Sequence, residues 1–273
     1  MKPPRVFTSF AEQGCSEIST DKSQQGSLLG SLVVLSAEES HHLRDVLRRR
    51  INDSVEICDT VTAKAFLGTI ISLTPTVTVA LSEALPEQIT ASLQQGPQIS
   101  LLFALSKGEK NDQVCDWATE LGCTQIILWQ SERSVVRIKT HSDRLAKESR
   151  LQRIAVGAAK QSRQSRPPTV LLAEDLRRAL TSAGIHSNSP GASELRLCCS
   201  LCAESISVRA AWNLLLPPQF VHLVIGPEGD LAPNEESILK EHGFILITLG
   251  KNVLRSELAA VSAVIATREI FTP

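Results

Sequence analysis

The first 85 residues contain short apolar stretches, rich in β-branched residues and bounded by turn-forming residues. Strand-like patterns cover 55–58, 63–71 and 76–81. Within 38–50, apolar residues recur instead at helical spacing, at Leu43, Val46 and Leu47. Several short strands and one amphipathic helix predict a small β-barrel domain over residues 1–85.

The pattern changes after 86–98, a polar segment with prolines near both ends that we interpret as a linker. Helix-like segments then alternate with strand-like apolar runs at 99–105, 124–130, 195–201, 220–226 and 244–250. The clearest helical segments cover 109–122, 143–162 and 257–270, and the first ends at Gly122, a residue type suited to a helix C-terminus. This alternation is typical of a mostly parallel sheet with helices on both faces, so we expect an α/β domain over 99–273.

Composition limits the function classes. The chain has 273 residues, 42% hydrophobic and 21% charged, with a net charge of −1. Its N-terminus lacks the apolar region of a secretory signal, and its apolar runs are too short to span a bilayer. We therefore expect a cytoplasmic protein without a membrane segment. Cys198, Cys199 and Cys202 lie close together, but no local His or Cys pair completes a zinc ligand set, so we expect reduced thiols and no metal.

Positive charge is concentrated in one part of the chain. Between Arg133 and Arg166 there are ten Lys or Arg residues against two acids, Asp143 and Glu148. A smaller group, Arg44 and Arg48–Arg50, lies on the N-terminal helix. A solvated helix face is the common explanation of a charge run, but such faces usually mix both signs. One-signed clustering favours a polyanion such as RNA, and the scarcity of aromatic residues favours backbone contacts over base stacking.

Two glycine-containing turns, 225–233 and 248–257, follow the last two strand-like runs. Ligands of open parallel sheets lie beyond the carboxyl ends of strands, and glycines let a ligand approach the main chain. Neither turn matches a Walker loop or GxGxxG, which disfavours a nucleoside triphosphate. Taken singly, each turn is more consistent with an ordinary strand–helix connector.

Four blocks together resemble one protein family: HHLRDVLRRRINDSVEICD, KGEKNDQVCDWATELGCTQIILWQSERSVVR, HLVIGPEGDL and LGKNVLRSELAAVSA. In order and spacing they are similar to the ribosomal RNA small subunit methyltransferase E family of the SPOUT superfamily, over nearly the whole chain. The resemblance implies an N-terminal PUA-like β-barrel that binds RNA and a C-terminal SPOUT α/β domain with a deep trefoil knot. It further implies S-adenosyl-L-methionine as cofactor, a homodimer, and methylation of N3 of a uridine in 16S rRNA of the small ribosomal subunit.

The resemblance also assigns site residues. Those implied to bind the cofactor are Leu201, Ile225, Gly226, Pro227, Glu228, Gly229, Leu249, Gly250, Val253 and Leu254. Several positions depart from the family pattern: Asp230 replaces a usual glycine, Ala232 a helix-capping serine, Lys251-Asn252 a Pro-Arg pair, Lys160 a glutamate and Arg163 a glycine. Because aspartate tolerates positive φ, we expect the turn at Asp230 to survive, and its charge to offset in part the missing cap at Ala232.

Methylation of a uracil imide requires loss of the N3 proton, and a fixed cation would stabilise the resulting charge. Arg255 is the candidate for that cation, with a surface arginine that binds loop carbonyls as the alternative. Glu257 is the candidate proton acceptor or orienting group, although an acid in a first helical turn is also favoured by the helix dipole. Candidate RNA contacts are Arg44, Arg48, Arg133, Arg137, Lys160, Arg163 and Arg166.

Two other functions remain open on the sequence alone. One is a SPOUT methyltransferase that acts on another RNA or another atom. The other is a non-catalytic relative that binds ribosomal RNA or assembly intermediates.

Overall fold

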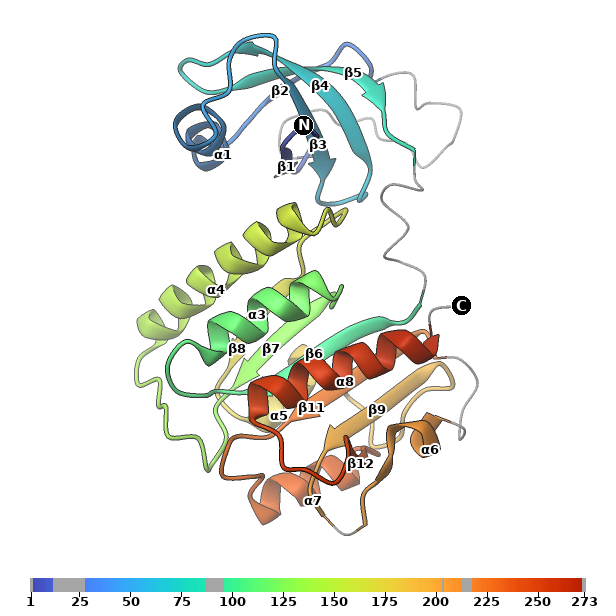
Figure 1. The fold of residues 1–273 in the computed structure, drawn as a ribbon. Helices are drawn as coiled ribbons and strands as arrows, with labels where there is room; N and C mark the ends of the chain where they lie inside the picture. The colour runs from blue at the N-terminus through green and yellow to red at the C-terminus, as the bar shows by residue number, and fades with distance from the viewer. Residues whose placement is uncertain (1, 12–27, 87–95, 203, 213–217, 272–273) are drawn as a thin grey trace. The chain divides into compact units, whose positions relative to one another are not determined.

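The chain folds into two compact units. The computed structural model describes residues 2–11, 28–86, 96–202, 204–212 and 218–271 (Figure 1). By their contacts, Met1–Leu93 and Ala159–Pro167 form one unit, and Gln94–Ala158 and Pro168–Pro273 form the other. Most of the linker expected at 86–98 lies outside the described residues.

The N-terminal unit contains a five-stranded sheet in the order β1-β3-β4-β5-β2. Its strands are β1 (Arg5–Thr8), β2 (Leu32–Val34), β3 (Ser54–Asp59), β4 (Ala65–Ser72) and β5 (Thr78–Ala84). The three strands expected from the apolar pattern are confirmed as β3, β4 and β5. The pattern did not predict β1 and β2, which are only four and three residues long. Side chains such as Phe10, Phe66 and Leu43 fill the core of this unit.

The helix expected over 38–50 is shorter. It consists of α1 (Ala37–His41) and a π-helical turn, η2 (His42–Val46). Arg48 adopts a φ of 51°, and the N–H of Arg49 donates to the carbonyl of Leu43 at 2.9 Å. A left-handed residue followed by this back-reaching hydrogen bond ends a helix, so the last predicted turn does not form.

The second unit is built on a seven-stranded parallel sheet in the order β10-β12-β9-β11-β6-β7-β8. Its strands are β6 (Gln98–Ala104), β7 (Gln125–Trp129), β8 (Thr169–Ala173), β9 (Glu194–Cys199), β10 (Ile206–Ser207), β11 (Phe220–Ile225) and β12 (Ile245–Thr248). Five of these are the expected apolar runs, and β8 and β10 were not predicted. The inner strands bury both faces, as the near-continuous apolar runs require.

Helices cover both faces of this sheet. They are α3 (Lys110–Glu120), α4 (His141–Gln161), α5 (Leu176–Ser182), α6 (Val208–Trp212), α7 (Pro233–Glu241) and α8 (Ser256–Phe271). One apolar core joins the sheet to α3, α4, α6 and α8, and a second joins its other face to α5 and α7. Gly122, with a φ of 83°, follows α3 as expected. The α/β prediction for this half is confirmed, which places the three loops described below at one edge of the sheet.

Candidate functional site

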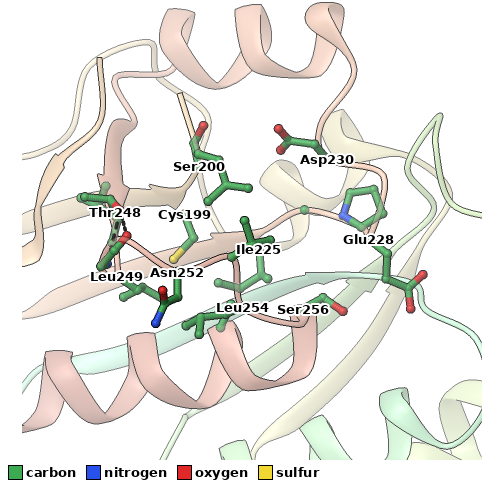
Figure 2. Close-up of a pocket in the computed structure, with 17 residues that line it drawn as sticks. Cys199, Ser200, Ile225, Glu228, Asp230, Thr248, Leu249, Asn252, Leu254 and Ser256 are labelled. Atoms are coloured by element: carbon green, nitrogen blue, oxygen red, sulfur yellow. Dashed lines mark hydrogen bonds between the residues drawn. The ribbon is translucent and has the colours of Figure 1, made fainter. Parts of the chain in front are cut away.

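A hollow lies where three neighbouring strands end. β12, β9 and β11 are adjacent and parallel, so their carboxyl ends meet at one edge of the sheet. The hollow measures about 650 Å³ with the part open to solvent included. Figure 2 shows that the residues lining the hollow belong to the loops at these strand ends and to the start of α8.

Nine of the ten residues implied to bind a cofactor line this hollow: Leu201, Ile225, Gly226, Pro227, Glu228, Leu249, Gly250, Val253 and Leu254. Gly229 does not. Sequence reasoning missed Asn252, Thr248 and Ser256, which also line it. All three lie within the turn 248–257 that the sequence singles out, so their position in that turn was the available signal.

Two glycines are required by the geometry of the loops. A Cβ on Gly226 would lie 3.1 Å from Cγ of Leu231, which is tighter than ordinary packing. Gly250 has a φ of 135°, which side-chain-bearing residues rarely adopt. The Thr248 hydroxyl donates to the Gly250 carbonyl at 2.9 Å and fixes this turn. Both loops therefore present main chain to the hollow.

Asp230 keeps the turn that a glycine usually makes. It has a φ of 64°, which confirms that the aspartate tolerates the left-handed conformation. Its Oδ1 accepts a hydrogen bond from the Leu231 N–H at 2.9 Å, and the residue lines the hollow. Its carboxylate thus contacts the turn itself.

Glu235 forms the reciprocal half of a capping box, because its carboxylate accepts from the backbone N–H of the N-cap residue Ala232. Its Oε2 accepts from the Ala232 N–H and the Ser131 hydroxyl, both at 2.9 Å, and its Oε1 accepts from the Glu132 N–H at 2.8 Å. Glu235 is only 3% exposed. This buried carboxylate joins the start of α7 to the segment after β7, a contact that no sequence motif indicated.

The two catalytic candidates flank the hollow without lining it. The Arg255 side chain is exposed and donates no hydrogen bond to any residue that the structure describes, so it does not bind loop carbonyls. Glu257 is buried in the first turn of α8, where its Oε2 accepts from the Ser256 hydroxyl at 3.3 Å. Burial alone would raise the pKa of Glu257, but its own backbone N–H and the Lys110 ammonium lower it overall.

Lys110 is a polar neighbour that sequence reasoning missed. Its Nζ lies 2.6 Å from Oε1 of Glu228 and 3.2 Å from Oε2 of Glu257. The hydrogen bond to Glu228 raises the pKa of Lys110, so the amine stays protonated. Lys110 is the first residue of α3, just beyond β6, and β6 is parallel and adjacent to β11. That position was the available signal that Lys110 lies near the loop after β11.

The thiol in the wall of the hollow, Cys199, lies in surroundings that favour its protonated form. Burial raises the pKa of Cys199 to about 12, so the sulfur stays protonated near neutral pH. The same cause raises the pKa of Cys198. Among the described residues, no group of three or more His, Cys, Asp or Glu side chains could hold a metal ion.

The predicted RNA contacts differ in whether an acidic residue of the chain pairs with them. Lys160 pairs with Glu39 at 2.7 Å and Arg163 pairs with Glu56, so both cations are neutralised within the N-terminal unit. Arg133 and Arg137 are exposed and contact only backbone carbonyls: Nη1 of Arg133 donates to Gly229 at 3.1 Å. Arg133 therefore adjoins the loop that forms the hollow.

The other three candidates lie in the N-terminal unit. Arg44 pairs with its neighbour Asp45 at 2.9 Å. Arg48 and Arg166 are exposed and make no ion pair within the described part of the chain. None of the helices in that part is long and apolar enough to cross a bilayer.

The known proteins that this chain resembles are RNA methyltransferases. A model of the RNA methyltransferase domain matches residues 94–268. Ribosomal RNA small subunit methyltransferase E of Mycobacterium bovis is 31% identical over 175 residues, which span 61% of each chain. The Bacillus subtilis protein of the same name is 27% identical over 85% of this chain and 88% of its own.

Solved structures share the fold. A Legionella pneumophila protein described as a methyltransferase, in complex with bound SAM, superposes with a TM-score of 0.77 at 25% identity and covers 99% of this chain and 98% of its own. Ribosomal RNA small subunit methyltransferase E from Neisseria gonorrhoeae, bound to S-adenosyl methionine, gives a TM-score of 0.78 at 24% identity with the same coverage and bears on the fold alone. The chain therefore belongs to the RNA methyltransferase domain family, as its resemblance to ribosomal RNA small subunit methyltransferase E proteins predicts.

Proposed function

We propose that this protein is an S-adenosyl-L-methionine-dependent methyltransferase that modifies N3 of a uridine in 16S rRNA of the small ribosomal subunit. The observation that carries the proposal is the hollow at the ends of β9, β11 and β12. Three segments far apart in sequence, each singled out by the family resemblance, line it together. Such an edge of parallel strands is a common place for a ligand.

The lining fits the cofactor. Ile225, Leu249 and Leu254 offer apolar walls for an adenine ring, and the loops at Gly226 and Gly250 offer backbone groups that read ring nitrogens and ribose hydroxyls. When bound there, S-adenosyl-L-methionine supplies an electrophilic methyl group on a sulfonium sulfur. The role of these residues is to bind and orient the donor and to keep water away from it.

Arg255 is the group suited to the acceptor base. Loss of the N3 proton spreads negative charge onto the two uracil carbonyl oxygens, and a guanidinium beside them stabilises that charge. The exposed Arg255 side chain lies directly before Ser256, which lines the hollow, and no described carboxylate neutralises it. These features support a role at the substrate rather than in the fold.

Glu257 is better suited to orientation than to proton abstraction. Its lowered pKa makes it a weak base, and its Oε2 already accepts from Ser256 and Lys110. A general base works best with a pKa near the working pH. We therefore assign Glu257 to holding the start of α8, and leave the proton acceptor outside this pair.

The RNA would be held mainly through its backbone. Arg133, Arg137, Arg48 and Arg166 keep exposed guanidinium groups, which suit phosphate contacts. In the same proposal, the N-terminal sheet is the PUA-like barrel of the family, and the loops around the hollow are part of its deep trefoil knot.

We extend the proposal to a homodimer. Val253, Leu258 and Ile265 are 76%, 49% and 43% exposed, although all three are apolar and lie on α8 or the loop before it. Apolar side chains grouped near a site are typical of an interface. Sedimentation velocity on Ile265→Glu should show monomers where the wild type shows dimers, and Leu145→Glu, an exposed position on α4, is the control. A dimer retained by Ile265→Glu would contradict this interface.

Titration calorimetry with S-adenosyl-L-methionine tests the enzyme proposal first. Absence of binding by the folded protein would favour a non-catalytic RNA-binding relative. Mass mapping of 16S rRNA from cells with and without the protein tests the substrate. A methyluridine that persists without the protein would move the target to another RNA or atom.

Arg255→Ala tests the catalytic assignment. It should lower the methyl-transfer rate about 100-fold, as loss of one charge-stabilising group does in other enzymes, while the Kd for the cofactor changes little. Arg177→Ala, an exposed arginine of α5, is the matched control. Equal losses in rate and cofactor affinity would assign Arg255 to cofactor binding instead.

A further inference from the structure

Lys110 connects three segments that approach the hollow from different strands. It begins α3, just beyond β6, and its ammonium contacts Glu228 on the loop after β11 and Glu257 in the first turn of α8. Glu228 lines the hollow, and Glu257 follows both Arg255 and the pocket residue Ser256. The Lys110 ammonium therefore joins the loop after β11 to the first turn of α8, which directly follows Arg255.

The backbone under Lys110 is firmly held. Asn111, 2% exposed, accepts from the Ser106 N–H at 3.0 Å and donates to the Ser106 carbonyl at 2.6 Å. The Ser106 hydroxyl lies 3.4 Å from that of Ser256. The start of α3 is thus fixed to the end of β6, so Lys110 acts from a rigid base.

The two carboxylates need a cation between them. Both lie within hydrogen-bond reach of one ammonium, so they would repel each other if it were removed. The Glu228 side chain is 40% exposed but that of Glu257 only 12%, so solvent screens the repulsion between them in part. The relaxed arrangement would move the loop, the first turn of α8, or both.

We propose that Lys110 is a positioning residue that holds the Glu228 loop and the first turn of α8 in register, so that cofactor and Arg255 face the same acceptor base. The inference rests on the proposed function for its kinetic consequence and on the geometry alone for its structural consequence. Lys110 contacts neither reacting atom in this account; it acts through Glu228 and Glu257.

The kinetic test compares Lys110→Met, Lys110→Arg and Lys107→Met in single-turnover methyl transfer to small-subunit RNA. A misplacement of about 1 Å can cost about 100-fold in rate, so Lys110→Met should lose about that much while its Kd for S-adenosyl-L-methionine stays within about fivefold. Lys110→Arg keeps the charge and should recover part of the rate. Lys107 is exposed and makes no ion pair with a described residue, so Lys107→Met should behave like the wild type.

A second measurement separates this inference from the enzyme proposal. Amide hydrogen exchange should accelerate in 225–232 and 253–260 of Lys110→Met, and adding Glu228→Gln to that variant should slow it again, because the repulsion is then gone. Unchanged exchange in both segments would overturn the inference, whether or not the wild type methylates RNA. A rate like that of Lys107→Met, or equal losses in rate and cofactor affinity, would also overturn it. If no variant, wild type included, transfers a methyl group, the proposed function fails and exchange alone decides the role of Lys110.

Discussion

Replacing Glu235 tests how the hollow is held to the segment that follows β7. The Glu235 carboxylate accepts three hydrogen bonds, from two backbone N–H groups and the Ser131 hydroxyl, and it is only 3% exposed. Glu235→Gln keeps one carbonyl oxygen, which can take the place of Oε2 and still accept from Ala232 and Ser131. The amide N–H₂ then faces the Glu132 N–H, which loses its acceptor, and the other two donors lose a charged one.

The structure gives the size of the effect. A buried donor left without a partner costs about 1–3 kcal/mol, and hydrogen bonds to a charged acceptor lie at the upper end. One unpaired donor and the loss of the charged acceptor together predict destabilisation by about 2 kcal/mol for Glu235→Gln. Glu235→Ala removes the acceptor of all three hydrogen bonds, so it should cost about 1–2 kcal/mol more. Glu241→Gln, at the exposed end of the same helix, should stay within about 0.5 kcal/mol of the wild type.

Urea unfolding followed by circular dichroism measures these differences, with the slope of the transition checked for change. A midpoint for Glu235→Gln that matches Glu241→Gln would refute the reasoning, because it would mean that the donor left unpaired finds another acceptor. A functional consequence should accompany the loss of stability. Arg133 follows the segment that Glu235 holds, so RNA affinity should fall in Glu235→Gln more than cofactor affinity does.

Three further predictions concern single positions. Asp230→Gly should keep the cofactor Kd within a few-fold, because a φ of 64° suits glycine; a larger change in calorimetry would mean that the carboxylate contacts the ligand. Burial lowers the pKa of His222 below its usual 6.5 despite the nearby Glu194, so the unfolded chain binds a proton more readily. The free energy of unfolding should therefore fall as pH drops through about 6.5. Urea titrations at pH 7.5 and 5.5 should show a smaller fall for His222→Gln than for the wild type; an equal fall in both proteins would contradict the reasoning. Gly157→Ala should raise the unfolding midpoint by the equivalent of about 0.5–1 kcal/mol, because the site is helical and a Cβ there meets nothing within 4 Å; a lowered midpoint would contradict it.

Periodicity predicted the elements that are long or strongly apolar. The parallel strands β6, β7, β9, β11 and β12 each carry an apolar run, and α8 carries a repeating apolar face, so local pattern and burial agree. β2 and β10 have three and two residues, too few for any period to appear. β8 has five residues, and its short apolar run lies between the basic segment and a polar insertion, where no longer pattern frames it.

The hollow could be anticipated because it depends on chain order and on strand direction. Turns that follow parallel strands come to one edge of a sheet, and glycines mark where the main chain is open to a ligand. Contacts made by long side chains across that edge could not be anticipated in the same way. Lys110 reaches Glu228, 118 positions along the chain, and only the sheet order brings them together.

Both replacements of a usual glycine have the same physical basis. Arg163 and Asp230 adopt φ values of 59° and 64°, the left-handed region where a glycine costs nothing. Each side chain contributes an interaction that offsets the strain: Arg163 pairs with the buried Glu56, and Asp230 accepts from the next backbone N–H. At these two positions the backbone adopts a conformation suited to glycine, and the side chain makes an additional contact.

Ion pairs within the fold reduce the positive charge that is available to bind RNA. Four of the ten basic residues between Arg133 and Arg166 pair with acids elsewhere in the chain: Arg144 with Glu174, Arg150 with Asp112, Lys160 with Glu39 and Arg163 with Glu56. A count of charges along the sequence leaves these four cations available to RNA, because the acids that pair with them are distant in sequence and come close only in the fold. The charge that remains exposed and unpaired with a described acid is richest just after β7, at Arg133, Arg137 and Lys139. Since Arg133 also donates to Gly229, the basic surface suited to RNA lies against the loop that forms the hollow, where a methyl donor and an RNA base would have to meet.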